Sequence, residues 1–243
     1  MFGVGLVLAG AVALPPVTSL PMRQQLMYGA KPVYCAGARG RSVALTFDDG
    51  PGPYTLRLVR VLRREHARAT FFLVGSRVGE WRRAARALRT VGAVGNHTWS
   101  HPHLATLPPL DVWRELARAQ FVIRRNVGIR PLVFRPPYEE ATPRDDRIAR
   151  SLSLVDVRWS VDTGDSRPGA TARNVLRTAR TGLRPGAIVL LHDLHPWTGA
   201  VARRLIRTAR RRHLRLATVP ELIARQPPSH RQLSSTGGTR CPR

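Results

Sequence analysis

Thr46-Phe47-Asp48-Asp49-Gly50-Pro51 places two adjacent carboxylates where a largely apolar run, Ser42 to Phe47, meets a Gly-Pro turn. A β-branched and aromatic run that ends at Gly and Pro is typical of a buried strand whose last residues enter a loop. In parallel α/β folds, polar residues at the carboxyl ends of strands are where chemistry tends to lie. Because neighbouring side chains point in different directions, we expect one acid to bind a metal and the other to accept a proton.

Outward from this stretch, apolar runs alternate with helical patterns. Short apolar runs predict further strands at 69–74, 93–95, 131–134, 154–161, 187–191 and 214–219. Apolar spacing and start or stop signals predict helices at 54–66, 80–91, 110–127, 144–152, 170–181, 198–212 and 220–225. The alternation predicts a single α/β domain with a mostly parallel sheet that forms a barrel or a barrel-like layer.

The 243 residues suit one domain, which we place at 41–225. Residues 1–40 begin with twenty mostly apolar, uncharged positions and continue as a linker. They predict an export signal or a membrane anchor, although the basic segment that precedes a signal is missing; an apolar element packed on the domain is the alternative. Residues 226–243 are rich in Pro, Ser, Gly and Thr and predict a disordered tail. We therefore expect a secreted or envelope-associated monomer that contacts a membrane only through its amino terminus.

The two cysteines, Cys35 and Cys241, lie near the two ends of the expected folded part. In an oxidising compartment they would form one bridge, and in a reducing compartment they would remain free thiols. The sequence does not choose between these states.

The chain is strongly basic, with 40 Lys and Arg against 15 Asp and Glu and a formal charge of +25. Lys31 is the only lysine, so the charge comes from arginine. Such a field favours polyanions, among them an anionic cell-wall polymer, nucleic acid or anionic lipid, whereas a plain bias in base composition is the other explanation. Aromatic residues make up 6% and are not interleaved with the arginines. A platform for stacking single-stranded nucleic acid is therefore not expected, and we expect no specific nucleic-acid partner.

Residues able to do chemistry follow the predicted strands. His97 and His101 have a spacing that lets two imidazoles meet one ion, and Asp49 completes a set suited to Zn²⁺ or another first-row divalent ion. Alone, such a pair is more typical of surface or capping histidines. The shared position of the whole group at strand ends is hard to assign to packing; its members are Asp48, Asp49, His97, Arg135, Asp162, Asp165 and His192.

Five segments resemble, in order and spacing, the motifs of the NodB-homology polysaccharide deacetylases, carbohydrate esterase family 4. They are TFDDGP at 46–51, the His97–His101 pair within GNHTWSHPHL, FRPPY at 134–138, VDTGD at 161–165 and IVLLHD at 188–193. The resemblance covers the chain from about Ser42 to Leu222. It implies a distorted (β/α) barrel of the NodB type.

The resemblance also implies a role for each matching residue. Asp49, His97 and His101 would bind one divalent metal, commonly zinc, with cobalt, manganese or iron as alternatives. Asp48 would be the general base, with Arg135 paired to it. His192 would be the general acid, with Asp165 orienting it. Two further positions would meet the substrate: the backbone N–H of Tyr138 at the oxyanion, and Leu190 at the acetyl methyl group.

The implied reaction is removal of N-acetyl groups from an N-acetylglucosamine polymer, peptidoglycan or a chitin-like oligosaccharide. Two alternatives remain: an acetylxylan-type O-acetyl esterase of the same family, and a catalytically impaired basic protein that binds wall polymer or nucleic acid. Three positions depart from the family pattern. Ser166 stands where tryptophan is usual, Glu139 and Glu140 stand where glycine is common, and Ala93 stands where an acid often precedes the GNH run. The lost indole would leave one wall of the acetyl pocket open.

Overall fold

The computed structural model describes residues 31–233 and 241, whose core is one parallel sheet. The strands are β1 Ser42–Gly50, β2 Ala69–Leu73, β3 Gly92–Asn96, β4 Val133–Phe134, β5 Val155–Asp156, β6 Val161–Asp162, β7 Ile188–His192 and β8 Arg215–Leu216. The α-helices are α2 Thr55–Arg64, α3 Gly75–Glu80, α4 Arg82–Leu88, α5 Pro109–Val127, α6 Pro143–Ser151, α7 Ala172–Gly182, α8 Thr198–Arg211, α9 Val219–Arg225 and α10 His230–Leu233. Two 3₁₀ turns, η2 Leu104–Thr106 and η3 Pro137–Glu139, complete the described elements.

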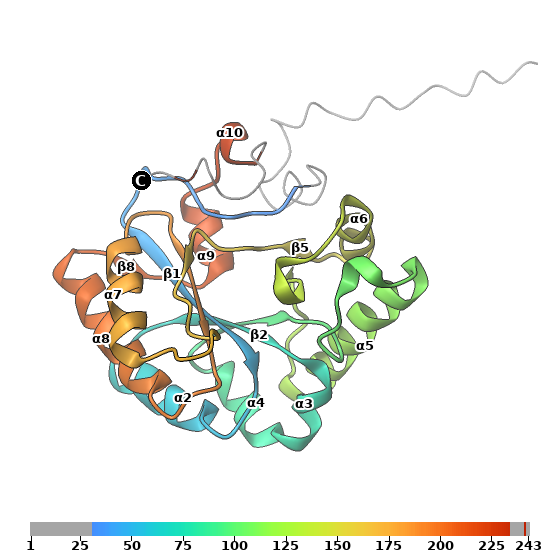
Figure 1. Ribbon diagram of the computed structural model, residues 1–243, viewed down its shortest axis with the longest axis horizontal. Helices are drawn as coiled ribbons and strands as arrows, with labels where there is room; N and C mark the ends of the chain where they lie inside the picture. Colours follow the sequence, from blue (N-terminus) through green and yellow to red (C-terminus); the bar gives the residue numbers. More distant parts are fainter. Residues whose placement is uncertain (1–30, 234–240, 242–243) are drawn as a thin grey trace, which may run out of the picture.

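The strands form a parallel half-barrel in the order β5-β4-β3-β2-β1-β7-β6, with β8 paired to β1 (Figure 1). Every pair is parallel. The carboxyl ends of the strands therefore meet along one edge. The predicted α/β class and barrel-like sheet are confirmed.

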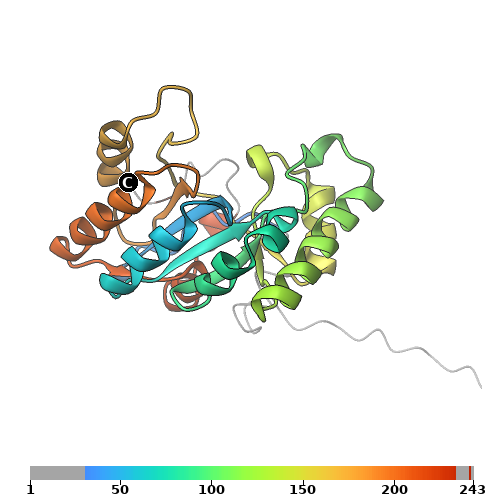
Figure 2. The same cartoon turned by 90° about the horizontal axis from the view of Figure 1, so that it is seen from below.

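Helices α2 to α8 form an outer layer that curves around the sheet, whereas α9 lies against its inner face (Figures 1 and 2). They bury aliphatic stripes against the sheet and turn arginines outward, as Leu58 and Leu62 of α2 and Leu205 and Ile206 of α8 illustrate. Under them, Phe47 of β1 stacks on a neighbouring phenylalanine of β2 at 5.7 Å between ring centroids. Each fully buried side chain of this kind contributes about 1.5–3 kcal/mol. A rigid core thus fixes the strand ends.

Two predicted elements differ in the structure. The helix expected at 80–91 is α4, which spans only Arg82–Leu88, and a separate helix, α3, which was not predicted, precedes it and ends at Trp81 with a non-helical φ of −101° and ψ of 35°. The strand expected at 154–161 is β5 and β6, which pair with β4 and β7 near opposite ends of the sheet. Residues 157–160 therefore cross between the two edges, so one continuous strand is geometrically excluded.

Both ends of the domain extend beyond the predicted limits. Val33 bridges to Val157, and Cys35 and Ala36 are buried, so part of the predicted linker belongs to the core. In the predicted tail, buried Gln226 accepts a hydrogen bond from the Ser42 backbone at 2.7 Å, and α10 follows. The prediction of disorder is thus wrong for 226–233, because polar side chains there satisfy buried backbone groups.

A disulfide joins Cys35 to Cys241. It selects the bridged state from the two that the sequence left open. The apolar segment 1–20 and residues 234–240 lie outside the described residues. Among those described, no helix combines the length and apolar character that crossing a membrane requires.

Candidate metal and acid–base site

Asp48 and Asp49 lie in the irregular carboxyl end of β1. The strand runs to Gly50, beyond the limit predicted at Phe47, and Asp48 stays in parallel register with His192. The register with β2 shifts between Phe47 and Gly50, and Asp49 has a φ of 66°. Such an irregularity re-aims side chains next to a site. It turns the two acids toward different neighbours, as expected.

Asp49 meets the two histidines. Its Oδ1 lies 3.3 Å from His97 Nε2 and 3.1 Å from His101 Nε2, and the three atoms lie within 4.8 Å of one another. Burial raises the pKa of Asp49, but His101 and His97 hold that pKa well below its usual range. Asp49 is therefore ionised at any physiological pH.

The donor chemistry of these atoms fits a cation. His97 Nδ1 lies 2.7 Å from the carbonyl oxygen of Arg135, which only accepts, so Nδ1 carries the proton and Nε2 of the neutral ring presents a lone pair. That lone pair faces Asp49 Oδ1, which is buried and accepts no hydrogen bond from the described residues. Two acceptors at this separation repel unless a positive charge lies between them. Two imidazoles and one carboxylate suit zinc or a similar ion.

A compact loop after β3, rather than a helical turn, presents the histidines. Asn96 closes it at one end, accepting from the backbone of Thr98 and donating to the carbonyl of Leu116, both at 2.8 Å. Thr98 Oγ1 in turn accepts from the backbone of His101 at 3.1 Å. Thr98 and His101 have φ of 66° and 65°. Strained residues of this kind persist only where their surroundings hold them.

Glu115 of α5 stabilises this strained loop through three hydrogen bonds. Its Oε2 accepts from the backbone N–H groups of Trp99 and Ser100 at 2.9 and 2.8 Å, and its Oε1 accepts from the Ser100 hydroxyl at 2.9 Å. Arg118, one turn along the same helix, covers the Trp99 ring at 3.7 Å. Sequence reasoning missed Glu115, because an acid on an amphipathic helix carries no local sign of such a role.

Arg135 holds Asp48 from the opposite side. Its guanidinium is fully buried and donates to Asp48 Oδ1 and Thr46 Oγ1, both at 2.8 Å, and to the carbonyls of Val157 and Arg158, both at 2.9 Å. Burial lowers the pKa of Arg135, and the charge of Asp48 opposes that shift. The second oxygen of Asp48 lies 4.0 Å from His97 Nε2, beside the metal-ligand group.

His192 and Asp165 form the other titratable pair. The ring Nδ1 lies 2.7 Å from Asp165 Oδ1, and the backbone N–H of His192 donates to Oδ2 at 2.6 Å. Burial alone would lower the pKa of His192, but the bond and charge of Asp165, with Asp48 and Asp49 nearby, raise it to about 9. The imidazolium form therefore dominates at neutral pH.

Asp193, next along the chain, ties β7 to the loop that follows Asp49. Its backbone N–H donates to the carbonyl of Asp48 at 3.0 Å, and its carboxyl accepts from the Thr55 hydroxyl, which itself accepts from Gly52 N–H at 2.8 Å. Burial raises the pKa of Asp193 to about 7, against the effect of the Thr55 bond. Its role was not recognised from the sequence.

Tyr138 lies at the rim of the site. Its ring meets His101 edge-on at 4.8 Å and stacks on His103 at 4.0 Å, while Glu140 Oε2 lies 2.8 Å from His103 Nδ1. Tyr138 and Glu139 have φ of 58° and 62°. Of the two glutamates that depart from the family pattern, Glu139 thus belongs to a strained turn and Glu140 to a surface hydrogen bond with His103.

Leu190 and Asp162 lie on neighbouring strands beside the site. Leu190 is buried on β7, in register with Thr46 on one side and Asp162 on the other. The carboxylate of Asp162 accepts from the Gly164 backbone at 2.8 Å and from Arg167 at 2.6 Å. Asp162 therefore stabilises its own loop and joins neither titratable pair.

Ser166 is exposed and follows the buried Asp165. An aromatic pair lies beside it: His195 stacks on Trp197 at 4.3 Å, and His195 Nε2 lies 2.8 Å from the carbonyl oxygen of Asp165. This pair is the aromatic surface next to the position of the missing indole.

Comparison with known proteins identifies the family. A sequence model described as polysaccharide deacetylase matches residues 36–157. The chain belongs to the polysaccharide deacetylase family. The predicted resemblance to carbohydrate esterase family 4 is confirmed, and this family depends on a metal, for which the Asp49, His97 and His101 group is the candidate site.

Similar proteins extend this finding. This deacetylase-family chain is 34% identical to the peptidoglycan-N-acetylglucosamine deacetylase PgdA of Listeria monocytogenes over 66% of its length, and it spans about a third, 34%, of that protein. It is 38% identical to a chitooligosaccharide deacetylase of Bradyrhizobium over 64% of this chain and 72% of that one. A solved structure of a mutant of BA3943, a family 4 pseudoenzyme of Bacillus anthracis with restored enzymatic activity, matches with a TM-score of 0.74 at 28% identity, covering 79% of this chain and 71% of that one.

Proposed function

We propose that the protein is a divalent-metal-dependent deacetylase that hydrolyses N-acetyl groups of an N-acetylglucosamine polymer, peptidoglycan or a chitin-like oligosaccharide, and releases acetate. One observation carries the proposal. The ligand atoms of Asp49, His97 and His101 converge beside Asp48, held by Arg135, and beside the imidazolium of His192, held by Asp165. The similarity to PgdA and to the chitooligosaccharide deacetylase supports this substrate class.

Asp49, His97 and His101 would hold the metal, for which we propose zinc, with cobalt, manganese or iron as alternatives. When bound, the ion supplies Lewis acidity toward water and toward the carbonyl oxygen of the acetamide. The ionised Asp49 and Nε2 of His97, whose other ring nitrogen is bonded to the Arg135 carbonyl, match this demand because each would offer a lone pair to the ion.

Asp48 is the proposed general base. Arg135 occupies its Oδ1 with a 2.8 Å bond, which leaves Oδ2, on the side of His97, to accept a proton from the attacking water. The water oxygen forms the new bond to the acetyl carbon. Because the guanidinium is fully buried, the opposite charge beside Asp48 is little screened by solvent.

His192 is the proposed general acid. Its Nδ1 donates to Asp165, so the proton on Nε2 is the one available to the leaving nitrogen. The C–N bond breaks as that proton arrives, and the products are acetate and a free amine. A pKa of about 9 keeps the donor protonated at neutral pH. The backbone N–H of Tyr138 would stabilise the oxyanion, and Leu190 would line the space for the acetyl methyl group.

Two alternatives stay open within this proposal. The same residues would hydrolyse an O-acetyl ester such as acetylxylan, and an impaired site would leave a basic binding protein. The similarity to a pseudoenzyme and the exposed Ser166 are the observations that favour impairment. Acetate release should therefore be measured over chito-oligosaccharides, peptidoglycan and acetylxylan with added Zn²⁺ or Co²⁺. Release from the first two supports the proposal; release from acetylxylan alone supports the esterase, and no release with metal bound supports impairment.

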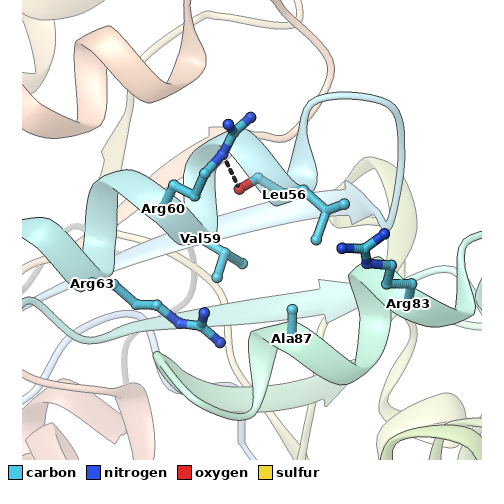
Figure 3. A pocket seen from close by; sticks show the side chains of 6 residues that line it. All are labelled: Leu56, Val59, Arg60, Arg63, Arg83 and Ala87. Atoms are coloured by element: carbon cyan, nitrogen blue, oxygen red, sulfur yellow. Dashed lines mark hydrogen bonds between the residues drawn. The ribbon is translucent and has the colours of Figure 1, made fainter.

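We further propose that the protein is secreted or envelope-associated and that its outer helices contact an anionic cell-wall polymer. Between α2 and α4 lies a groove of about 530 Å³ (Figure 3), lined by Leu56, Val59, Arg60, Arg63, Arg83 and Ala87. A second groove, of about 610 Å³, has arginines of α7 and α8 at its edge. Among the residues that the structure describes, no acid lines either groove, and arginine binds phosphate well. Salt-dependent cosedimentation with purified cell wall, lost after its anionic polymers are extracted, tests the contact.

A further inference from the structure

Arg158, which lies between β5 and β6, is a buried charged residue for which the proposed chemistry gives no role. Its guanidinium grips Asp156, with Nε 2.9 Å from both carboxylate oxygens and Nη2 2.8 Å from Oδ2. The remaining terminal nitrogen, Nη1, donates to the backbone carbonyl of Glu139. Arg158 thus connects the crossing segment to the turn that carries Tyr138.

The backbone of the same residue connects to the base. The carbonyl of Arg158 accepts from Arg135 Nη2 at 2.9 Å, and the preceding carbonyl accepts from Arg135 Nε at 2.9 Å. Arg135 in turn donates to Asp48 at 2.8 Å. Arg158 therefore contacts both Arg135, which supports the proposed base, and the turn that carries Tyr138, the proposed oxyanion donor.

The turn needs such a support. Tyr138 and Glu139 are consecutive residues with side chains and positive φ, 58° and 62°. Left-handed backbone is unfavourable for residues other than glycine and persists where the surroundings impose it. The 3.0 Å bond from Glu140 N–H to the carbonyl of Pro137 closes the turn, and Arg158 donates to the carbonyl of Glu139.

Asp156 has a second buried acid as a neighbour. Burial, together with the nearby Asp156, raises the pKa of Asp146 of α6 to about 8. The Asp156 carboxylate is bonded to Arg158. The chain of contacts runs from α6 through Asp156 and Arg158 to the rim of the site.

We infer that Arg158 is a positioning residue that fixes the Tyr138–Glu139 turn relative to the Asp48–Arg135 pair. The inference rests on the proposed function insofar as the Tyr138 N–H acts on the oxyanion. An oxyanion donor acts in the transition state, so a displaced turn lowers kcat and leaves KM and metal binding nearly unchanged.

The test compares Arg158→Gln and Arg158→Lys with a matched control, Arg144→Gln. Arg144 also pairs with an aspartate, at 2.8 Å, and donates to a backbone carbonyl, that of Leu107, at 2.9 Å, but it does not contact the turn. We expect Arg158→Gln to lower kcat by about 10- to 100-fold with KM and the Zn²⁺ dissociation constant within about threefold of the control. Arg158→Lys should retain an intermediate kcat.

A readout independent of activity accompanies the kinetics. Hydrogen exchange at residues 138–140 should become faster in Arg158→Gln than in Arg144→Gln, while exchange in β1 stays unchanged. If the wild type releases no acetate, the proposed function fails and the exchange measurement alone decides the inference. Unchanged exchange at the turn, kcat within about twofold of the control, or a parallel loss of Zn²⁺ affinity and thermal stability in both Arg158 variants would overturn it.

Discussion

Asp48 and Asp49 are adjacent, yet their surroundings give them different chemistry. Asp48 is buried and bonded to a buried guanidinium, whereas Asp49 presents Oδ1 to two imidazole nitrogens. The irregular end of β1 and the φ of 66° at Asp49 produce this separation. Arg77 stabilises it by donating to the carbonyl of Asp49 at 3.0 Å.

The protonation of a single residue, His192, sets the alkaline pH dependence of the proposed reaction. With the pKa of His192 raised to about 9, the proton donor is present below pH 9 and is lost as the pH rises through that value. Asp165→Asn removes a bond and a charge that raise this pKa, while burial, which lowers it, remains. We expect the alkaline limb of the kcat profile to move down by at least about one pH unit. His195→Gln, which alters a neighbour bonded only to the backbone of Asp165, is the control.

The sequence predicted those site residues that lie at the carboxyl end of a strand. Asp49, His97 and His192 each end a strand or follow one, and parallel strands bring such ends together. The structure places them as neighbours, whereas Asp162, at an equivalent position, turns to its own loop. Strand-end position alone therefore does not decide which side chains enter the site.

At the scale of elements, the loop from Asn96 to His101 depends on a helix far along the chain. Glu115 of α5 accepts three hydrogen bonds from Trp99 and Ser100 and so fixes the backbone between the two histidines. Such contacts have no local signature, because they join residues that are 15 and 16 positions apart along the chain. For the same reason the roles of Arg77 and Arg158 could not be predicted.

Glu115→Gln should therefore weaken metal binding. The amide keeps the size of the carboxylate, but it removes the charge that accepts the loop N–H groups, and supporting interactions of this kind are typically worth 10- to 100-fold in metal affinity. Titration calorimetry with Zn²⁺ measures the effect. Asp111→Asn on the same helix, at a surface pair with Arg114, should leave affinity unchanged; equal affinities in the two variants would contradict the role of Glu115.

At the scale of the whole molecule, the chain ends are tied across the fold. The disulfide from Cys35 to Cys241 closes a segment with a sequence separation of 206, and the Gln232 amide packs against its Cys35 sulfur at 3.3 Å. Composition could show that two cysteines lie near the ends, but pairing them requires the fold. The extension of the domain to Val33 and α10 follows from the same contacts.

Removal of this bridge should lower stability and spare the site. The double variant Cys35→Ser, Cys241→Ser is expected to lose about 2–5 kcal/mol of the free energy of unfolding, because the unfolded chain regains the freedom of a long loop. Denaturant unfolding of oxidised and reduced protein measures the difference. Reductant should destabilise the wild type and leave the double variant unaffected; a wild type insensitive to reductant would contradict a structural bridge.

Metal-dependent deacetylation is tested by acetate release from N-acetylglucosamine oligomers, measured for the wild type and Asp48→Asn before chelation, after chelation and again after Zn²⁺ is restored. We predict that chelation abolishes release and Zn²⁺ restores it in the wild type. Asp48→Asn should bind Zn²⁺ with intact ligands yet release acetate at least about 100-fold more slowly. Release that survives chelation, or an Asp48→Asn variant as active as the wild type, would contradict the account.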